Sequence, residues 1–489
     1  MQGLAETITH GQPSKNRTHN TRTIFDISPE IGHAFVAPIH EALFEQYKTY
    51  QSQYFPFVPL STDLSSGTIM EERPFLYTCC VMTTSHRDPA LQSRIARDVL
   101  KYLSEHMILA GEKDLDLLQG LLVMTAWYHM YINSNPQLMN LLHLAQALAV
   151  DLGLNQAPGP WGLSIKAAPD ATFKIHGNEA EPPKLNLENC RVRLGLYHVH
   201  ARYSVAFRRL DPPTWTDWLE ECCRVLEEAV QYQSDAYAVA LVRLDHITER
   251  YTGPSGFKPG SSMPVQAYVK LFSDDIHRLG LNMPDHLRTW PLMLADIQAA
   301  EMHLFESVIG AACDVPVHRV EAYHACLKKV LAYLDTFTSQ DIAQVPYQPF
   351  LSTVSLAHAF DIVSRLSFAQ AEGWDLTYVR STPGFNTLSD RMYTMLKSVQ
   401  EREESMYPTS RSIRFKVFCL RLEKFKQWYN AKVQQERSSQ QSRDKEDVVD
   451  NWPPSDGLSS LPVMADFSDL LWQDYTIDSS KLDSDFNFA

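Results

Sequence analysis

Residues 114–128 have the sequence DLDLLQGLLVMTAWY, and this stretch decides the fold class. Two sets of apolar residues in it recur at helical spacing and fall on different faces: Leu115, Leu118, Leu122 and Ala126, and Leu117, Leu121, Met124 and Tyr128. A helix that is apolar on nearly all sides belongs in the interior of a protein. The stretch therefore predicts a central helix surrounded by other helices.

Helical spacing also fills most of the chain on both sides of this stretch. It begins at Ser28 or Pro29, and a later helix ends at Gly153, where glycine is a favoured C-terminal cap. Thr214 and Asp217 resemble a capping box that starts another helix. Further helices are expected at 265–279, 291–310, 316–338, 350–370, 385–400 and 410–433. No segment shows the two-residue alternation and β-branched enrichment of strands, so the sequence predicts an all-α fold.

Composition divides the chain into one large multi-helix domain and two tails. The expected parts are a disordered N-terminal segment at 1–28, a helical domain at 29–433, a disordered linker at 434–463 and an acidic, aromatic segment at 464–489. Two stretches rich in glycine and proline, 155–187 and 252–264, could subdivide the helical domain. Such long loops are uncommon inside compact domains.

Charge is distributed unevenly along the 489 residues, which have a formal net charge of −14. Residues 444–489 contain eleven acidic and two basic side chains, a net charge of −9, so only −5 remains for the rest. Residues 411–443 are instead basic, with nine bases and two acids among regularly spaced apolar residues. We interpret the basic stretch as a packed amphipathic helix with a basic solvent face, although phosphate binding or nuclear import is an alternative.

Sites for catalysis, cofactors, metals or DNA are not indicated by any motif. The sequence has no GxGxxG, P-loop, GxSxG or HExxH pattern, so we expect a protein that is not an enzyme and needs no cofactor. Its eight cysteines form no CxxC pair, and we expect reduced core thiols and no stoichiometric zinc. His198 and His200 lie two residues apart and would point away from each other on a helix.

Targeting and membrane segments are not expected either. Residues 1–28 have no apolar signal-peptide core. The longest apolar stretch, 115–132, is too short and too polar to span a bilayer. We therefore expect an intracellular protein without a membrane partner.

Several segments carry, in order, the features of one family. They are Tyr54-Phe-Pro-Phe-Val58, Glu72-Arg-Pro-Phe-Leu76, the opening stretch 114–128 and Ala147–Asn155. This series resembles the middle-homology, or regulatory, region of fungal zinc binuclear cluster transcription factors, especially those associated with secondary-metabolite gene clusters. The resemblance covers roughly residues 27–250 well and continues in general character to about 433. The residues at the centre of the motif are Asp116, Leu117, Leu118, Gln119, Gly120 and Trp127.

The resemblance implies a helical regulatory domain in a nuclear transcriptional regulator. Members of this family usually begin with a six-cysteine DNA-binding cluster, whereas the first cysteine here, Cys79, lies inside the predicted helical domain. DNA contact is therefore expected only indirectly, through a DNA-bound partner or a homodimer, unless the sequence starts downstream of such a cluster.

The acidic tail supports a regulatory role independently of the resemblance. Aspartates alternate there with candidate anchors for a coactivator: Phe467, Leu470, Leu471, Trp472 and Tyr475. Acidic side chains keep apolar groups solvated and accessible in a disordered chain. A solubilising tail or a strand docked on its own domain is the alternative. For the whole chain, a helical scaffold or adaptor outside transcription is the main alternative, and a ligand-binding protein or enzyme with a pocket near Trp127 and residues 155–187 is the least favoured.

Overall fold

The regular structure of this protein is helical throughout the part that the structure describes. The computed structural model describes residues 37–128, 137–156, 186–207, 210–252, 265–310, 316–381, 384–410 and 414–446. All of the regular elements in these ranges are helices, which confirms the predicted all-α fold. None of the described helices is both long and apolar enough to cross a membrane.

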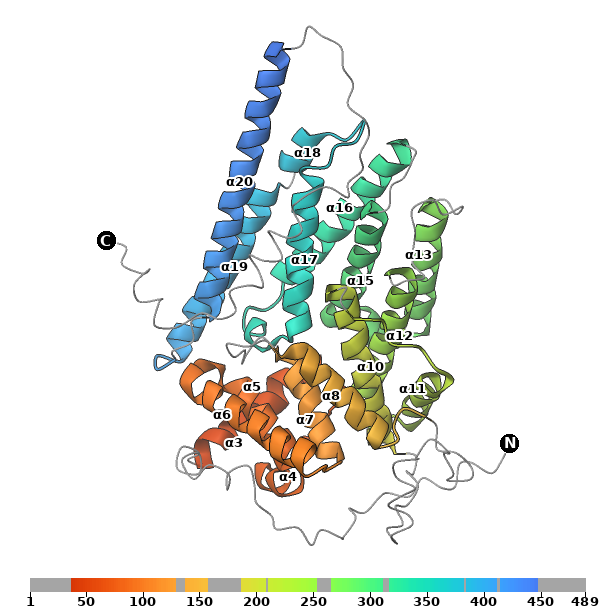
Figure 1. The fold of residues 1–489 in the computed structure, drawn as a ribbon, viewed down its shortest axis with the longest axis vertical. Coiled ribbons are helices and arrows are strands. Elements are labelled where there is room, and N and C mark those ends of the chain that lie inside the picture. Colours follow the sequence, from red (N-terminus) through yellow and green to blue (C-terminus); the bar gives the residue numbers. More distant parts are fainter. Residues whose placement is uncertain are drawn as a thin grey trace.

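The first helices gather at one end of the molecule (Figure 1). They are α3 (Ala37–Gln46), α4 (Ser66–Glu72), α5 (Pro74–Thr84), α6 (Pro89–Tyr102), α7 (Leu115–Ala126) and α8 (Leu138–Asp151). The predicted central helix is α7, and it packs against α5, α8, α10 and α17. The side chain of Asp114 caps its N-terminus by accepting a hydrogen bond from the backbone N–H of Leu117 at 2.9 Å.

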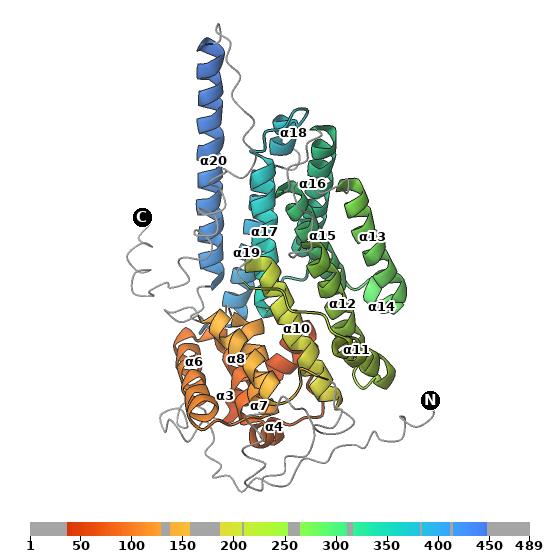
Figure 2. The ribbon, with the colours of Figure 1, turned by 45° about the vertical axis from the view of Figure 1, so that its right-hand side comes forward.

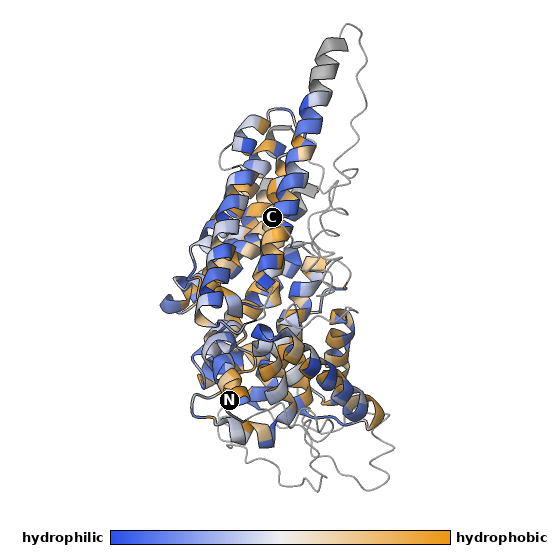
Figure 3. Cartoon of the chain, turned by 90° about the vertical axis from the view of Figure 1, so that its left-hand side faces the viewer, coloured by the Kyte–Doolittle hydropathy of each residue, from blue (hydrophilic) through white to orange (hydrophobic). Residues whose placement is uncertain are grey.

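The remaining helices, most of which are longer, extend away from this end (Figures 1 and 2). They are α10 (Leu187–Phe207), α11 (Asp217–Ala229), α12 (Ser234–Thr252), α13 (Val265–Asn282), α14 (Asp285–Arg288), α15 (Pro291–Gly310), α16 (Pro316–Thr338), α17 (Phe350–Leu366), α18 (Leu376–Ser381), α19 (Phe385–Met406) and α20 (Arg414–Glu446). Figure 3 shows that the long helices carry both hydrophilic and hydrophobic residues, as expected of amphipathic helices packed side by side.

The buried apolar residues form two hydrophobic cores. The first core joins α3–α8 to α10–α13 and includes Met293, Ala300 and Leu304 of α15. The second core joins α15–α20 and includes Ala299 and Met302 of the same helix. Helix α17 also contributes to both cores. The packing therefore divides along α15 and α17. The subdivision suggested at 155–187 and 252–264 stays a prediction.

Two sequence-based boundaries differ from the structure. The N-terminal cap of α11 is Thr216, whose side chain accepts from the N–H of Leu219 at 3.3 Å, so the capping box predicted for Thr214 is wrong. Helix α20 continues to Glu446 through part of the predicted disordered linker. Residues 434–446 contain no proline or glycine and many good helix formers, so a helix that is already nucleated can continue. Gly153 has φ 72°, as predicted for a helix C-terminal cap.

Helix α20 is also the basic stretch of the sequence. Its buried residues share one side of the helix: Phe415, Cys419, Phe425, Tyr429 and Val433. Lys416 and Lys424 are exposed. The structure thus shows the packed amphipathic helix that we favoured over a phosphate-binding element.

Candidate functional site

The motif residues of α7 organise the helices around them. The carboxylate of Asp116 accepts hydrogen bonds from the backbone N–H groups of Phe75 at 3.1 Å and Leu76 at 2.8 Å. These groups belong to the first turn of α5, where a helix has no partners of its own for its N–H groups. Asp116 therefore caps α5 from a different helix. Burial raises the pKa of Asp116 to about 7 in spite of these two hydrogen bonds.

Gln119 and Trp127 make the remaining polar connections of the motif. Gln119 accepts a hydrogen bond from Arg73 Nη1 and donates one to Glu188 Oε1, each at 2.9 Å. It thereby joins the start of α5 to the start of α10. The indole N–H of Trp127 donates to the carbonyl oxygen of Tyr347 at 3.0 Å. Leu117 and Leu118 are buried, so the described contacts of all these motif residues hold helices together.

Gly120 allows α5 and α7 to approach each other closely. A Cβ atom at this position would lie 2.3 Å from the ring of Phe75 and 3.1 Å from Sγ of Cys79. We expect Gly120→Ala to lower the free energy of unfolding by about 1–3 kcal/mol, because the aromatic ring must move within a packed core. Urea unfolding followed by circular dichroism measures this change.

The matched control is Gly280→Ala in α13. A Cβ atom there would meet nothing within 4 Å, so this variant should gain about 0.4–1 kcal/mol from the lower entropy of its unfolded chain. Equal effects of the two substitutions would contradict the close approach of α5 and α7.

A cavity of about 50 Å³ with both polar and apolar lining lies where helices of both cores meet. Its polar lining residues come from α10, α12, α15, α16 and α17 and from the segments before α17, and they include His198, Arg202, Tyr237, Asp296, Tyr333, Gln348 and Ser355. A smaller cavity of about 10 Å³ also touches Arg202 and is lined by Asp245 and His303. Arg202, Leu351 and Ser355 line both cavities.

The charges around the cavity are already largely paired. Arg202 Nη2 lies 3.4 Å from Asp296 Oδ1, and its Nη1 lies 4.0 Å from Asp245 Oδ1. His198 Nδ1 lies 2.6 Å from Asp245 Oδ2, and the hydroxyl of Tyr237 donates to Asp296 at 2.9 Å. A cavity of this size holds several water molecules and is far smaller than a typical cofactor site. These residues supply no nucleophile next to a free base.

The least favoured interpretation of the sequence placed a pocket near Trp127 and residues 155–187. Trp127 lines neither of these two cavities. Residues 157–185 lie outside the described residues. The larger cavity instead touches Ala126, the neighbour of Trp127 in the chain.

The cysteines and the histidines His198 and His200 have the environments that the sequence predicts. The seven described cysteines are buried and free. Burial raises the pKa of the Cys79 and Cys80 thiols well above the usual range, so these thiols stay protonated. His198 faces Asp245, whereas His200 contacts Gln146 of α8. Cys313 and the tail anchors Phe467, Leu470, Leu471, Trp472 and Tyr475 lie outside the described residues.

An ion pair joins the α3–α8 end of the molecule to α19. Arg87 donates to both carboxylate oxygens of Glu403, at 2.9 and 3.1 Å. The same guanidinium group lies 3.6 Å from the ring centre of Tyr407 and donates to the Tyr347 hydroxyl at 3.1 Å. Burial lowers the pKa of the neighbouring His86 to about 4, so this imidazole is neutral at neutral pH. No sequence pattern indicated this connection, because its partners are more than 250 residues apart.

Comparison with known proteins finds sequence similarity to fungal transcription regulators. No family model and no solved structure matches the chain. It is 24% identical over 388 residues to the transcription factor opdL of Penicillium oxalicum, which covers 75% of this chain and 67% of opdL. It is 23% identical over 345 residues to the transcription factor himD of Aspergillus japonicus, covering 68% of this chain and 56% of himD.

A more distant relative is also named as a regulator of transcription. The transcriptional regulator WAR1 of Candida albicans is 21% identical over 355 residues, which are 66% of this chain and 35% of WAR1. The chain thus spans between about a third and two thirds of the length of these relatives. The resemblance found in its sequence is confirmed, and the chain is a homologue of fungal transcription factors of the kind whose regulatory regions it resembles.

Proposed function

We propose that the chain acts in the nucleus as a transcriptional activator of a fungal gene cluster, such as one for a secondary metabolite. The observation that carries this proposal is the similarity to fungal transcription factors over 66–75% of the chain. The names of these relatives describe regulators and not enzymes. The small, charge-paired cavity agrees with a regulatory role, since a substrate or cofactor site is usually larger.

The proposal assigns different tasks to the helical domain and to the acidic tail. The helical domain with its two cores is the regulatory part, and residues 464–489 bind a transcriptional coactivator. The residues of this sequence reach DNA through a DNA-bound partner or a homodimer, unless the sequence starts downstream of a DNA-binding cluster. The net charge of −9 in residues 444–489 supports this division, because an acidic segment is not suited to bind the DNA backbone itself.

Fusion of the full chain to an unrelated DNA-binding domain tests the proposal. We expect the fusion to accumulate in fungal nuclei and to activate a reporter gene that carries the matching DNA site. A matched fusion that ends at residue 463 should fold equally well and activate far less, because it lacks the coactivator-binding segment. A full-length fusion that is expressed, nuclear and silent would contradict activation, and the scaffold or adaptor interpretation would replace it.

A further inference from the structure

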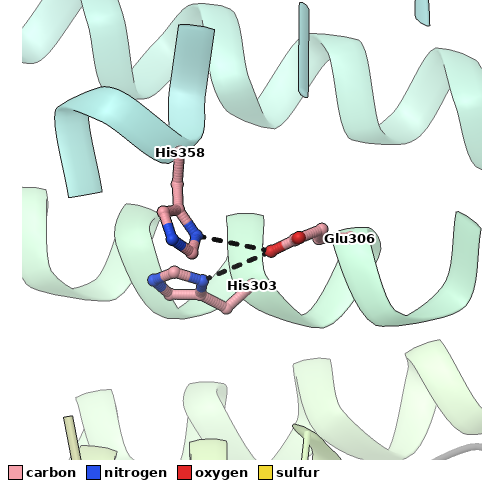
Figure 4. Close-up of side chains that lie close together, drawn as sticks. All are labelled: His303, Glu306 and His358. Carbon is pink, nitrogen blue, oxygen red and sulfur yellow. Dashed lines mark ion pairs between the residues drawn. The ribbon is translucent and has the colours of Figure 1, made fainter. Parts of the chain in front are cut away.

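Two histidines and a glutamate from two helices converge in the interior of the molecule (Figure 4). His303 and Glu306 are one turn apart on α15, and His358 faces them from α17. His303 Nδ1 lies 3.7 Å and His358 Nδ1 lies 3.5 Å from the same carboxylate oxygen, Glu306 Oε2. One ligand atom from each residue lies within 4.8 Å of the other two. His303 and Glu306 are only 7% and 4% exposed.

The two nitrogen–oxygen separations, 3.7 Å from His303 and 3.5 Å from His358 to Glu306, are longer than hydrogen bonds and close to those between ligands of a metal ion. A nitrogen–oxygen hydrogen bond spans about 2.7–3.2 Å. Two ligands bound to zinc at about 2.0–2.1 Å in a tetrahedron lie roughly 3.3–3.4 Å apart. In addition, Nδ1 of His303 is buried and makes no hydrogen bond within the described part of the chain. We propose that His303, Glu306 and His358 bind one divalent transition-metal ion, with zinc as the ion that fits best.

The surrounding charges favour a bound cation at this position. Arg365 lies 3.2 Å from Glu306 Oε1, which leaves Oε2 turned toward the two histidines. Arg365 also lies 3.6 Å from Asp361, so one guanidinium group serves two carboxylates. A second shell of this kind orients a ligating carboxylate.

The position of the site indicates what a metal ion would do. Helices α15 and α17 each contribute buried side chains to both cores. An ion held by both would stabilise their packing and hence the connection between the cores. Three protein ligands leave a fourth coordination position open. The sequence led us to expect no stoichiometric zinc, because its cysteines lack the spacing of zinc ligands. The proposed site differs from that expectation because it uses no cysteine.

Titration of the metal-stripped full chain with Zn²⁺ and Co²⁺ tests the site. We expect one ion per chain with micromolar or tighter affinity, and intense visible absorption of the Co²⁺ form, which is typical of a four-coordinate site. Zn²⁺ at a hundredfold excess over its Kd should raise the Tm by roughly 3–5 °C. Absence of tight binding would overturn the proposal.

Variants distinguish this site from any other metal-binding group of the chain. His303→Gln and His358→Gln should each abolish the visible absorption and the Tm increase. His358 is the more exposed of the two histidines, with 19% of its side chain accessible, so His358→Gln tests the proposal even if His303→Gln fails to fold. The exposed His143 on α8 gives the matched control, since His143→Gln should bind as the wild type does. Unchanged binding by His358→Gln would show that the ion sits elsewhere and would reject the site.

Discussion

Replacement of Leu118 by aspartate should abolish the cooperative unfolding of the helical domain. Leu118 has no exposed surface, and its helix α7 packs against α5, α8, α10 and α17. The substitution removes about 1.5–3 kcal/mol of apolar burial and adds the cost of a buried, unpaired carboxylate. Together these losses approach the total stability of roughly 5–15 kcal/mol that is typical of a protein. Thermal melting followed by circular dichroism should show a broad, early transition or none.

The matched control is Val150→Asp on the neighbouring helix α8. Val150 is 56% exposed, so a carboxylate there remains solvated and should change the free energy of unfolding by less than about 0.5 kcal/mol. If Leu118→Asp melted like the wild type, α7 would have to be exposed. It would then be a surface for a partner and not the centre of the first core.

Helix positions were the most predictable part of this structure, because they depend on local patterns. The predicted helices at 291–310 and 316–338 have the observed bounds of α15 and α16. Each begins at a proline, which is favoured in the first turn of a helix. Periodicity likewise predicts that α7 is buried on nearly all sides, and eleven of its twelve residues are buried.

The same patterns do not predict contacts between segments that are distant in the sequence. Asp116 is acidic and lies in an apolar helix, and nothing local indicates that it caps α5. The connection from Trp127 to Tyr347 joins residues that are 220 positions apart. The pair His303 and Glu306 has helical spacing in the sequence, but His358 becomes their neighbour only through the packing of α17 on α15. Local patterns predict which face of a helix is buried. They do not predict which faces pack against each other, and these sites depend on that packing.

The acidic tail leads to the prediction with the largest functional effect. Residues 464–489, fused alone to an unrelated DNA-binding domain, should activate a reporter gene. The motivating observation is the alternation of aspartates with Phe467, Leu470, Leu471, Trp472 and Tyr475. Phe467, Leu470 and Leu471 fall on one face if the segment becomes helical, which is the arrangement of a helix bound in an apolar groove.

Apolar burial should dominate the binding of this tail, and charge should contribute less. Each buried anchor is worth roughly 1.5–3 kcal/mol, whereas a micromolar affinity amounts to about 8 kcal/mol in total. Replacing Phe467, Leu471 and Trp472 together by alanine should therefore abolish reporter activity. Replacing Asp469 and Asp474 by asparagine should reduce it only partly, because these charges mainly speed the encounter and keep the segment accessible.

Comparison of these two variants separates a coactivator-binding segment from a tail that only keeps the chain dissolved. A solubilising tail depends on its charges, so the asparagine variant should then be the more damaged of the two and should show reduced soluble expression. A groove-binding segment depends on its anchors, so the alanine variant should be inactive at an unchanged nuclear level. If both variants and the unaltered tail leave the reporter silent while the fusions are nuclear, residues 464–489 do not activate transcription. The similarity to transcription factors would then assign regulation to the helical domain alone, acting through its partners.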